Sequence, residues 1–538
     1  MEENNNVLEN EELQNDSLPT LFNLTKSDTV FAVCAFIAVI FFSLFGIFSG
    51  FALGYLIASA LTIILFGVYF AKSGKVRFLS LISGLLALAN GAIFICTTNG
   101  SVRFFGVIIG FLLSLVCFDG FANGTAKGDR QTFGIFYSVA STLGNIGITL
   151  RSLFSSNSDN KKTIGKAFIG LLCAIPVLFV VVPLLISSDD AFKGMMSSIF
   201  SNTFTFFLKT IFGVSICPFF ISYGFSLKTG RVAKIKEGNF KGIENTYLIS
   251  FLSAISVSYV LYLFSQLAYF FSAFKGFLPD GDITYAQYAR KGFFEMCVIA
   301  VINLLIVFLA LFLAKKENGK VCHTIKAILT FISVFTLIII ATAISKMVLY
   351  IGTYGMTVLR VTTSAFMLFL SIVFISVILR IYIKKINIIK TALITAGSII
   401  LILGTANVNH VCARYNYESY KTQRLDTIDI QGLYELGYEG IPYIVKLAST
   451  EDFDIALEAQ GYLAKAYLYD YFDNMEDAVY FTVDDLKANE INKDFAHFNI
   501  PKALAYDALY DYIEENPWFS TICQSHFSEP DETYYSDF

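Results

Sequence analysis

Apolar segments of about 20 residues, repeated up to residue 405, are the feature that most constrains this fold. An α-helix needs about 20 residues to cross the roughly 30 Å hydrocarbon core of a bilayer while satisfying its own backbone hydrogen bonds. We predict eleven such spans, at approximately residues 29–49, 51–71, 78–97, 104–121, 167–187, 204–227, 247–271, 292–314, 326–349, 361–382 and 388–405. Only 15% of the residues are charged and 55% are hydrophobic, as expected for a multi-pass membrane protein. The predicted fold class is all-α, a polytopic transmembrane helical bundle over residues 29–405.

Lysine and arginine residues near the span ends predict the orientation, because they tend to remain on the cytoplasmic side of a membrane. With the amino terminus inside, 23 of them fall on the cytoplasmic side and 8 on the outer side up to residue 404. Residues 1–28 are acidic and asparagine-rich, and we expect them to form a disordered cytoplasmic tail and not a cleavable signal peptide. An odd number of spans then places the carboxyl-terminal region outside.

Residues 406–538 differ from the rest of the chain and are predicted to form an acidic, mainly helical extracytoplasmic domain. From Thr405 onward there are 25 acidic and 8 basic residues, a formal charge of −17 that argues against a nucleic-acid partner. Apolar residues recur there at spacings of three and four, as in an amphipathic helix. The two clearest runs are Leu463, Ala464, Tyr467, Leu468 and Tyr471, and Leu504, Ala508, Leu509 and Tyr512. The region also holds 16 tyrosines, which either build its core or present rings that stack on sugars or peptides.

Two connections between spans have helical character of their own. Residues 131–154 have apolar residues at helical spacing but are rich in glycine and serine, which predicts an interfacial helix on the inner leaflet. A twelfth, re-entrant segment is the alternative for this stretch. Residues 187–203 are predicted to form a short amphipathic helix on the outer face.

Four motifs resemble a family of Gram-positive bacterial membrane proteins, the domain of unknown function numbered 4173, which has a relative numbered 4153. The motifs are "LLISSDDAF" (184–192), "YAQYARKGFFEM" (285–296), "LYIGTYGMTVLRVTTSAFM" (349–367) and "ARYNYESY" with "TIDIQGLYELGYEGIPYIVKL" (within 413–447). The resemblance implies an integral protein of the bacterial plasma membrane and supplies no activity. This chain has Asp189-Asp190 where the family usually reads Asp-Pro, and Lys291 where an acid often follows the arginine.

Arg290, Lys291 and Glu295 lie where the outer leaflet meets the predicted span 292–314. One interpretation is that the cations anchor the helix in the headgroups while Glu295 meets the positive end of the helix dipole. A second adds Lys346 and Arg360, at the outer ends of the next two spans, to form a pocket that binds phosphate or carboxylate. A third is that these cations dock the acidic outer domain.

No residue is predicted to be catalytic, and no metal or cofactor is predicted. Asp189 and Asp190 are secondary candidates, either as a helix cap and topological stop, or as metal ligands or the acidic pair of a lipid-linked transferase. The four histidines have no ligand spacing to one another or to cysteine, and an outer disulfide between Cys412 and Cys523 is allowed but not established.

The predicted function is that of an envelope-associated interaction or sensory component, with enzymatic activity less expected. A transporter, or a membrane protein that binds an anionic lipid or small molecule, is the first alternative, and a lipid-linked transferase is the second. The expected partners are the lipid bilayer and either anionic lipid headgroups or an envelope protein.

Overall fold

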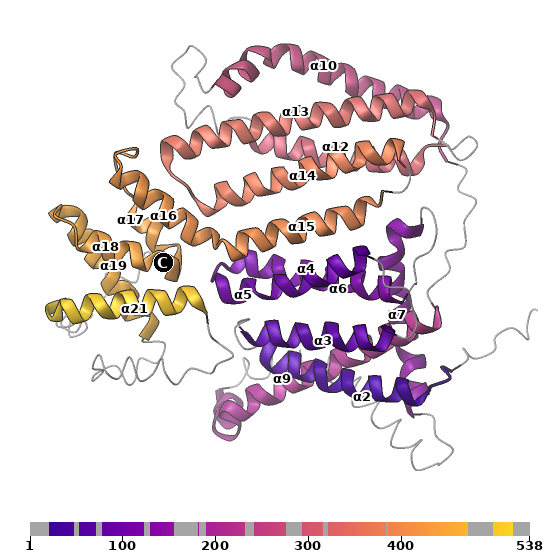
Figure 1. Ribbon diagram of the computed structural model, residues 1–538, viewed down its shortest axis with the longest axis horizontal. Coiled ribbons are helices and arrows are strands. Elements are labelled where there is room, and N and C mark those ends of the chain that lie inside the picture. The colour runs from indigo at the N-terminus through magenta and orange to yellow at the C-terminus, as the bar shows by residue number, and fades with distance from the viewer. Residues whose placement is uncertain are drawn as a thin grey trace, which may run out of the picture. The chain divides into compact units, whose positions relative to one another are not determined.

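Apart from one isolated β-bridge between Ile243 and Ala314, the regular secondary structure of the described residues is helical in this computed structural model (Figure 1). The structure describes residues 21–47, 53–71, 78–122, 130–154, 181, 190–231, 242–275, 293–315, 321–383, 386–471 and 499–519. The chain divides into two compact units, residues 1–88 with 114–235 and residues 89–113 with 236–538. The predicted all-α class is confirmed for the described part of the chain.

The first unit holds α2 (Lys26–Phe41), the π-helical turn η1 (Phe42–Ile47), α3 (Leu53–Ala71), α7 (Arg130–Phe154), α9 (Asp190–Thr229) and parts of α4 (Phe78–Gly91) and α6 (Gly100–Phe121). Asp28 lies in the first turn of α2 and forms a salt bridge with Lys228 near the end of α9. Asp28 also accepts a hydrogen bond of 2.7 Å from the Tyr69 hydroxyl, and the Tyr69 ring stacks on Phe31 with centroids 3.8 Å apart. These contacts join one end of α2 to the ends of α3 and α9.

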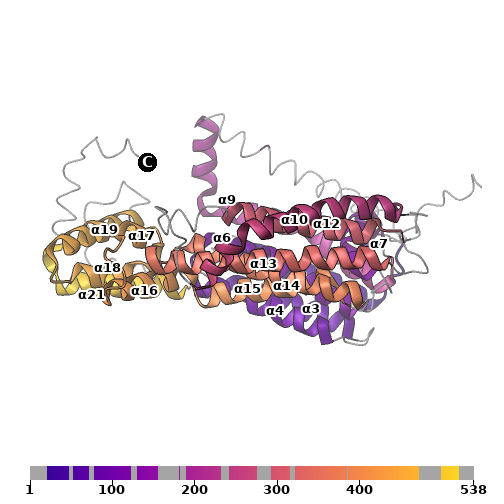
Figure 2. The same ribbon diagram turned by 90° about the horizontal axis from the view of Figure 1, so that it is seen from above.

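The second unit holds the remaining apolar helices: α5 (Ile93–Cys96), α10 (Asn245–Lys275), α12 (Phe293–Leu313), α13 (His323–Tyr354), α14 (Val358–Tyr382) and α15 (Ile388–Thr405). Neighbouring helices pack along their lengths, α10 and α12 on α13, α13 on α14, and α14 on α15 (Figure 2). Asn303 of α12 is fully buried among them, where it accepts a hydrogen bond from the Tyr259 hydroxyl and donates one of 2.9 Å to the Thr336 hydroxyl. This amide therefore links α10, α12 and α13 in the interior.

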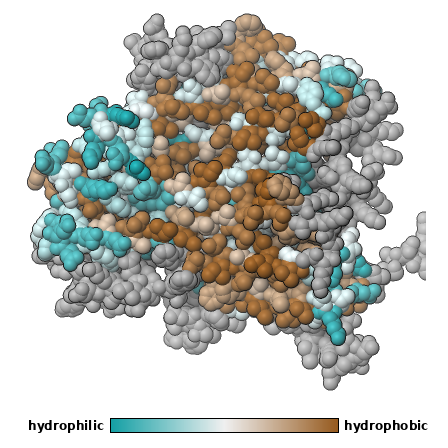
Figure 3. Space-filling view, viewed as in Figure 1, coloured by the Kyte–Doolittle hydropathy of each residue, from teal (hydrophilic) through white to brown (hydrophobic). Residues whose placement is uncertain are grey.

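Shorter helices follow α15 in the same unit and share a hydrophobic core. They are α16 (Val408–Lys421), α17 (Ile430–Tyr434), the 3₁₀ turn η2 (Gly437–Glu439), α18 (Ile441–Ala448), α19 (Phe453–Tyr471) and α21 (Ile500–Glu515). Ile444, Leu463 and Leu509 lie in the core, and Tyr443, Tyr506, Tyr510 and Tyr512 are buried with them. These tyrosines thus build the core, which was one of the two roles predicted for them. Figure 3 shows hydrophilic surface over the exposed parts of α16 to α19 and hydrophobic surface over α13 to α15.

Nine helices of the described residues are long and apolar enough to cross a membrane. They are residues 26–46, 53–70, 100–121, 208–229, 245–264, 295–313, 323–354, 358–382 and 388–405, each overlapping a predicted span. Many of their large apolar side chains are exposed on the protein surface, as lipid contact requires, among them Val68, Phe104 and Leu359. The fold therefore defines a multi-pass integral membrane protein.

Two predicted spans differ from these nine. The span predicted at 78–97 is interrupted near Ala92, which separates α4 from α5, and its apolar stretch, residues 80–96, is shorter than the other nine helices. The span predicted at 167–187 lies outside the described residues except for Val181.

The boundary predicted near residue 203 is wrong, because residues 190–229 form the single helix α9. The short outer helix at 187–203 and the span at 204–227 were predicted as separate elements. The polar stretch at Ser197–Thr203 contains no glycine or proline, so nothing in it forces the helix to end. Even Pro218 lies inside α9.

The segment predicted to lie on the inner leaflet forms α7, which crosses the carboxyl-terminal end of α9. The Ser222 hydroxyl donates a hydrogen bond of 3.0 Å to the Thr142 carbonyl, and Asn145 donates one of 3.0 Å to the Ser226 hydroxyl. Asn145 also donates to the Arg231 carbonyl at 3.1 Å. All of these bonds involve the last three turns of α9 or the residues just after it, and the interfacial position of α7 stays a prediction.

Candidate functional site: the α16 cavity

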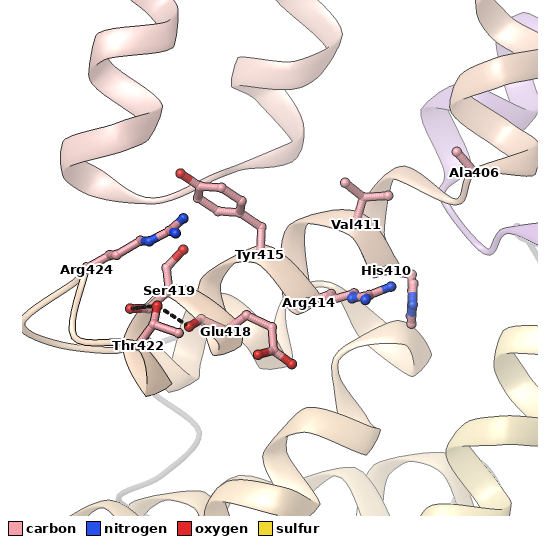
Figure 4. A pocket seen from close by; sticks show the side chains of 9 residues that line it. All are labelled: Ala406, His410, Val411, Arg414, Tyr415, Glu418, Ser419, Thr422 and Arg424. Atoms are coloured by element: carbon pink, nitrogen blue, oxygen red, sulfur yellow. Dashed lines mark hydrogen bonds between the residues drawn. The ribbon is translucent and has the colours of Figure 1, made fainter.

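An open cavity of about 570 Å³ lies along one side of α16 (Figure 4). We call it the α16 cavity. It starts at Ala406, directly after the last residue of α15, and ends at Arg424 beyond the carboxyl terminus of α16. The other lining residues are His410, Val411, Arg414, Tyr415, Glu418, Ser419 and Thr422. Their spacing of three and four places them on one face of the helix.

The ends of α16 are set by two residues in the left-handed backbone region. Asn407 has φ 55° and its side-chain oxygen accepts a hydrogen bond of 3.3 Å from the His410 backbone N–H, which caps the helix. At the other end Gln423 has φ 57°, and the Arg424 N–H donates a hydrogen bond of 2.8 Å to the Ser419 carbonyl. This second turn brings Arg424 back beside the helix it follows.

Positive charge predominates in the cavity. Arg414 and Arg424 are both exposed, and neither guanidinium makes a hydrogen bond or an ion pair within the described part of the chain. Glu418 is the one acid among the lining residues. A guanidinium binds phosphate and carboxylate groups through paired hydrogen bonds. The cavity can therefore hold an anion, although the region from residue 405 onward has many more acids than bases.

His410 is a half-buried residue of the cavity. Its pKa is lowered below the usual value first by burial and then by the positive charges of Arg414 and Lys446, while Glu439 acts in the opposite direction. The imidazole Nε2 lies 3.4 Å from the Tyr443 hydroxyl. His410 is therefore neutral at pH 7 in the absence of a ligand, and an anion bound beside it would favour its protonation.

A buried polar junction joins the base of α16 to the loop between α5 and α6. We define the polar junction as Thr97, Thr98, Asn99, Asn407, Asn409, Glu439 and Asn499. The Glu439 carboxylate is 3% exposed and accepts hydrogen bonds from the Thr98 N–H at 2.8 Å and the Thr98 hydroxyl at 2.5 Å. The Thr97 hydroxyl donates at 3.1 Å to Asn407, the residue that caps α16. The base of α16, where the cavity starts, is thus joined by hydrogen bonds to the end of the apolar helices.

The opposite side of α16 holds the turn between α13 and α14. Asn416 accepts a hydrogen bond of 2.7 Å from the Met356 N–H and donates one of 2.8 Å to the Met356 carbonyl. Gly355 has φ 78°, and a Cβ there would lie 2.8 Å from the Asn416 side-chain oxygen. Only glycine fits this close approach without strain.

The residues predicted from the sequence to form a pocket are placed only in part. Arg290, Lys291 and Asp189 lie outside the described residues, and Asp190 is the first residue of α9. Glu295 is exposed in the first turn of α12, whereas Lys346 of α13 is 7% exposed.

Arg360 lies in the first turn of α14. Its guanidinium donates to the carbonyls of Tyr354, at 3.0 Å, and Gly355, and lies 4.1 Å from the centre of the Tyr350 ring. The helices α12, α13 and α14 pack together, as the pocket hypothesis requires. Arg360, however, binds the α13–α14 turn.

The residues of the α16 cavity were not among the site residues predicted from sequence. The available signal was the i, i+4, i+8 spacing of His410, Arg414 and Glu418 beyond the final span. Arg424 has no such signal, because its position depends on the turn at Gln423. Cys412 is a buried free thiol in the same helix, and its predicted partner Cys523 lies outside the described residues. Among the described residues no group of three or more His, Cys, Asp or Glu could hold a metal ion.

Comparison with known sequences identifies the family. The family described as "Domain of unknown function (DUF4153)" matches residues 17–447, and the chain belongs to it. This is the relative named alongside the 4173 family in the resemblance above, and the match begins well before the motifs that carried it. No curated protein and no solved structure matches the chain.

Proposed function

We propose that this multi-pass membrane protein binds an anionic ligand, bearing a phosphate or carboxylate group, in the α16 cavity, and thereby acts as an envelope-associated sensory or interaction component. The observation that carries the proposal is the pair Arg414 and Arg424, two exposed guanidinium groups without described hydrogen-bond or ion-pair partners that line one cavity with His410. A free surface arginine is ordinary by itself. Two arginines and a histidine around about 570 Å³, in a strongly acidic part of the chain, are the arrangement an anion needs.

The place of the cavity, next to the end of a span, admits two sources of the anion. Its lining starts at Ala406, one residue after the span α15 ends, and includes the exposed side chain of Val411. A ligand in it would lie at the level of lipid headgroups, so an anionic phospholipid and a soluble phosphate compound both have access. Both carry the phosphate group that the two arginines would bind.

The topology expected from the sequence completes the proposal. Eleven spans in a bacterial plasma membrane, with a cytoplasmic amino terminus, would place residues 406–538 on the outer side as an extracytoplasmic domain. The excess of basic residues at the opposite span ends supports this orientation. Arg290, Lys291, Glu295, Lys346 and Arg360 are expected at the same membrane face, where the cations would add to the attraction for anionic headgroups.

Native mass spectrometry of the full-length protein tests the proposal and distinguishes the two sources. The protein would be released from phosphatidylcholine nanodiscs that contain or lack phosphatidylglycerol, and in a separate arm would receive inorganic phosphate or pyrophosphate. We expect one retained anion, with affinity reduced about tenfold or more in the Arg414→Gln/Arg424→Gln variant because two charge-assisted contacts are lost.

The matched control is Lys465→Gln, which removes an exposed cation of α19 that does not line the cavity. It should bind like the unsubstituted protein. Equal affinities in the double variant and the unsubstituted protein, in both the lipid and the phosphate arms, would contradict the proposal.

A further inference from the structure

The first turn of α21 is fixed at the end of the apolar helices. The Asn499 side-chain amide donates to the carbonyls of Phe94 at 3.1 Å, Ile95 at 3.3 Å and Thr97 at 3.4 Å. Its side-chain oxygen accepts from the Lys502 N–H at 3.2 Å and caps α21. These carbonyls belong to α5 and to the loop that leads into the span starting at Gly100. Asn499 is 6% exposed, so the anchor is buried.

The exposed face of α21 changes its chemistry along the helix. Ile500 and Leu504, one turn apart next to the anchor, are 43% and 54% exposed. Farther along the same face the exposed residues are acidic, namely Asp507, Asp511, Glu514 and Glu515. Figure 3 shows this change as hydrophobic surface at the end of α21 nearest α5 and hydrophilic surface toward its other end.

The core does not explain the exposure of these two residues. The opposite face of α21 packs Ala505, Leu509 and Ile513 into the core. The change from apolar to acidic side chains takes place between residues 504 and 507, over about 5 Å of helix. A boundary of this kind, perpendicular to the helix and next to the span ends, is expected where a helix leaves a bilayer interface.

The neighbouring surface is also of the lipid-contacting kind. Phe104 and Phe105, in the first two turns of α6, are 61% and 51% exposed, and Ile402 in the last turn of α15 is 63% exposed. Aromatic and aliphatic residues at span ends occupy the interface between headgroups and acyl chains. Apolar residues anchored beside the same loop are positioned to continue that surface.

We propose that the first two turns of α21, with Ile500 and Leu504, form a lipid-contacting foot that rests in the bilayer interface, with the acidic part of the helix outside it. The occupant of this surface is the bilayer in which the protein is already embedded. This inference depends on the spans and on the Asn499 anchor, and it is independent of anion binding in the α16 cavity.

The single tryptophan of the chain makes the proposal directly testable. Trp518 lies beyond the far end of α21 and is 44% exposed. The Leu504→Trp/Trp518→Phe variant moves the only indole to the proposed foot, and Asp511→Trp/Trp518→Phe moves it to the acidic part of the same face. Each full-length protein is placed in phosphatidylcholine nanodiscs with or without dibrominated acyl chains, and emission is also measured with acrylamide.

We expect brominated lipid to lower the emission of the indole at position 504 roughly twofold. The apolar face of an interfacial helix is buried about 5–10 Å into the boundary between headgroups and acyl chains, within reach of the bromines. The emission of the indole at position 511 and of the native Trp518 should stay nearly unchanged. Acrylamide, which quenches from the water, should lower the emission at positions 511 and 518 more than the emission at position 504. If Leu504→Trp fails to give a monodisperse protein, Ile500→Trp in the same Trp518→Phe background gives the equivalent measurement.

Two results would contradict the proposal that Ile500 and Leu504 contact lipid. Equal bromine quenching at positions 504 and 511 would show that the apolar turn lies no deeper than the acidic one. Shielding of the indole at position 504 from both acrylamide and brominated lipid would show that a protein surface covers it.

Discussion

Helices α16 and α21 are anchored in the same way but expose different surfaces. Each begins at an asparagine, Asn407 or Asn499, whose side-chain oxygen caps the helix and which also bonds to the loop between α5 and α6. Beyond these anchors α16 presents Arg414 with His410, whereas α21 presents apolar side chains followed by acids. The comparison shows that anchoring and ligand chemistry are separate properties of these helices. One anchored helix is suited to an anion and the other to lipid.

The loop between α5 and α6 holds both helices, and Glu439 of the polar junction bonds to this loop. Removal of the Glu439 carboxylate should therefore have the largest effect on stability. Glu439→Ala leaves the partly buried Thr98 N–H and hydroxyl without the buried carboxylate acceptor they now have, and we expect a loss of about 3 kcal/mol in unfolding free energy. Thermal unfolding of the detergent-solubilised protein measures this as a lower Tm. Glu435→Ala, four residues earlier and exposed, should change the free energy by no more than about 0.5 kcal/mol. Similar Tm values for the two variants would show that the junction does not stabilise either helix.

The two asparagines should respond differently to the same substitution. Asn499→Asp retains the cap oxygen but replaces an amide donor by a carboxylate that faces three carbonyls, and should cost about 2 kcal/mol. Asn407 uses its side-chain oxygen to accept from the Thr97 hydroxyl and the His410 N–H, so Asn407→Asp keeps both bonds. Its cost comes instead from a new charge beside the buried Glu439 carboxylate, which shares the Thr97 hydroxyl. Thermal unfolding of both variants, alone and combined with Glu439→Gln, provides the measurement. The Glu439→Gln background should remove most of the cost of Asn407→Asp and little of the cost of Asn499→Asp, and the reverse would contradict the proposed roles of donor and acceptor.

The pH dependence of anion binding should be the smallest effect. Because burial, Arg414 and Lys446 lower the pKa of His410, its charge appears only as the pH falls below its usual value of about 6.5. A bound anion favours the charged form, so affinity should rise about threefold between pH 7.5 and 5.5. The affinity of His410→Gln should change less over this range. The same rise in the variant would assign the titration to another group.

The stability of the protein without ligand should change with pH in the opposite direction. A lowered histidine pKa means that the unfolded chain binds the proton more readily than the folded one. The contribution of His410 is therefore complete above pH 6.5 or so and is lost as the pH falls through its folded pKa. Denaturation of the unsubstituted protein and of His410→Gln at the same two pH values separates this effect from ligand binding.

The apolar spans could be predicted from sequence because length and composition alone define a helix that crosses a bilayer. The helix at α21 could also be predicted from spacing, and its buried face in part. Leu509 and Tyr512 of the predicted apolar repeat are buried, whereas Leu504 of the same repeat is exposed. Periodicity locates an apolar side of a helix without saying whether protein or lipid covers it.

The α16 cavity was harder to predict because it depends on backbone turns. Asn407 and Gln423 adopt left-handed conformations that a single sequence does not specify, and they bring Ala406 and Arg424 to the two ends of one cavity. The cations that the sequence placed together were instead those at predicted span ends. Among these, Arg360 bonds to the carbonyls of the adjacent turn.

Direct observation of the ligand is the most decisive measurement of the central claim. The full-length protein in phosphatidylglycerol-containing nanodiscs, or saturated with pyrophosphate, would be imaged by electron cryomicroscopy alongside the Arg414→Gln/Arg424→Gln variant. The account predicts phosphate density in contact with both arginine side chains in the α16 cavity and its absence from the variant. An empty cavity in the unsubstituted protein under conditions that saturate anion binding, with density at another site, would contradict it.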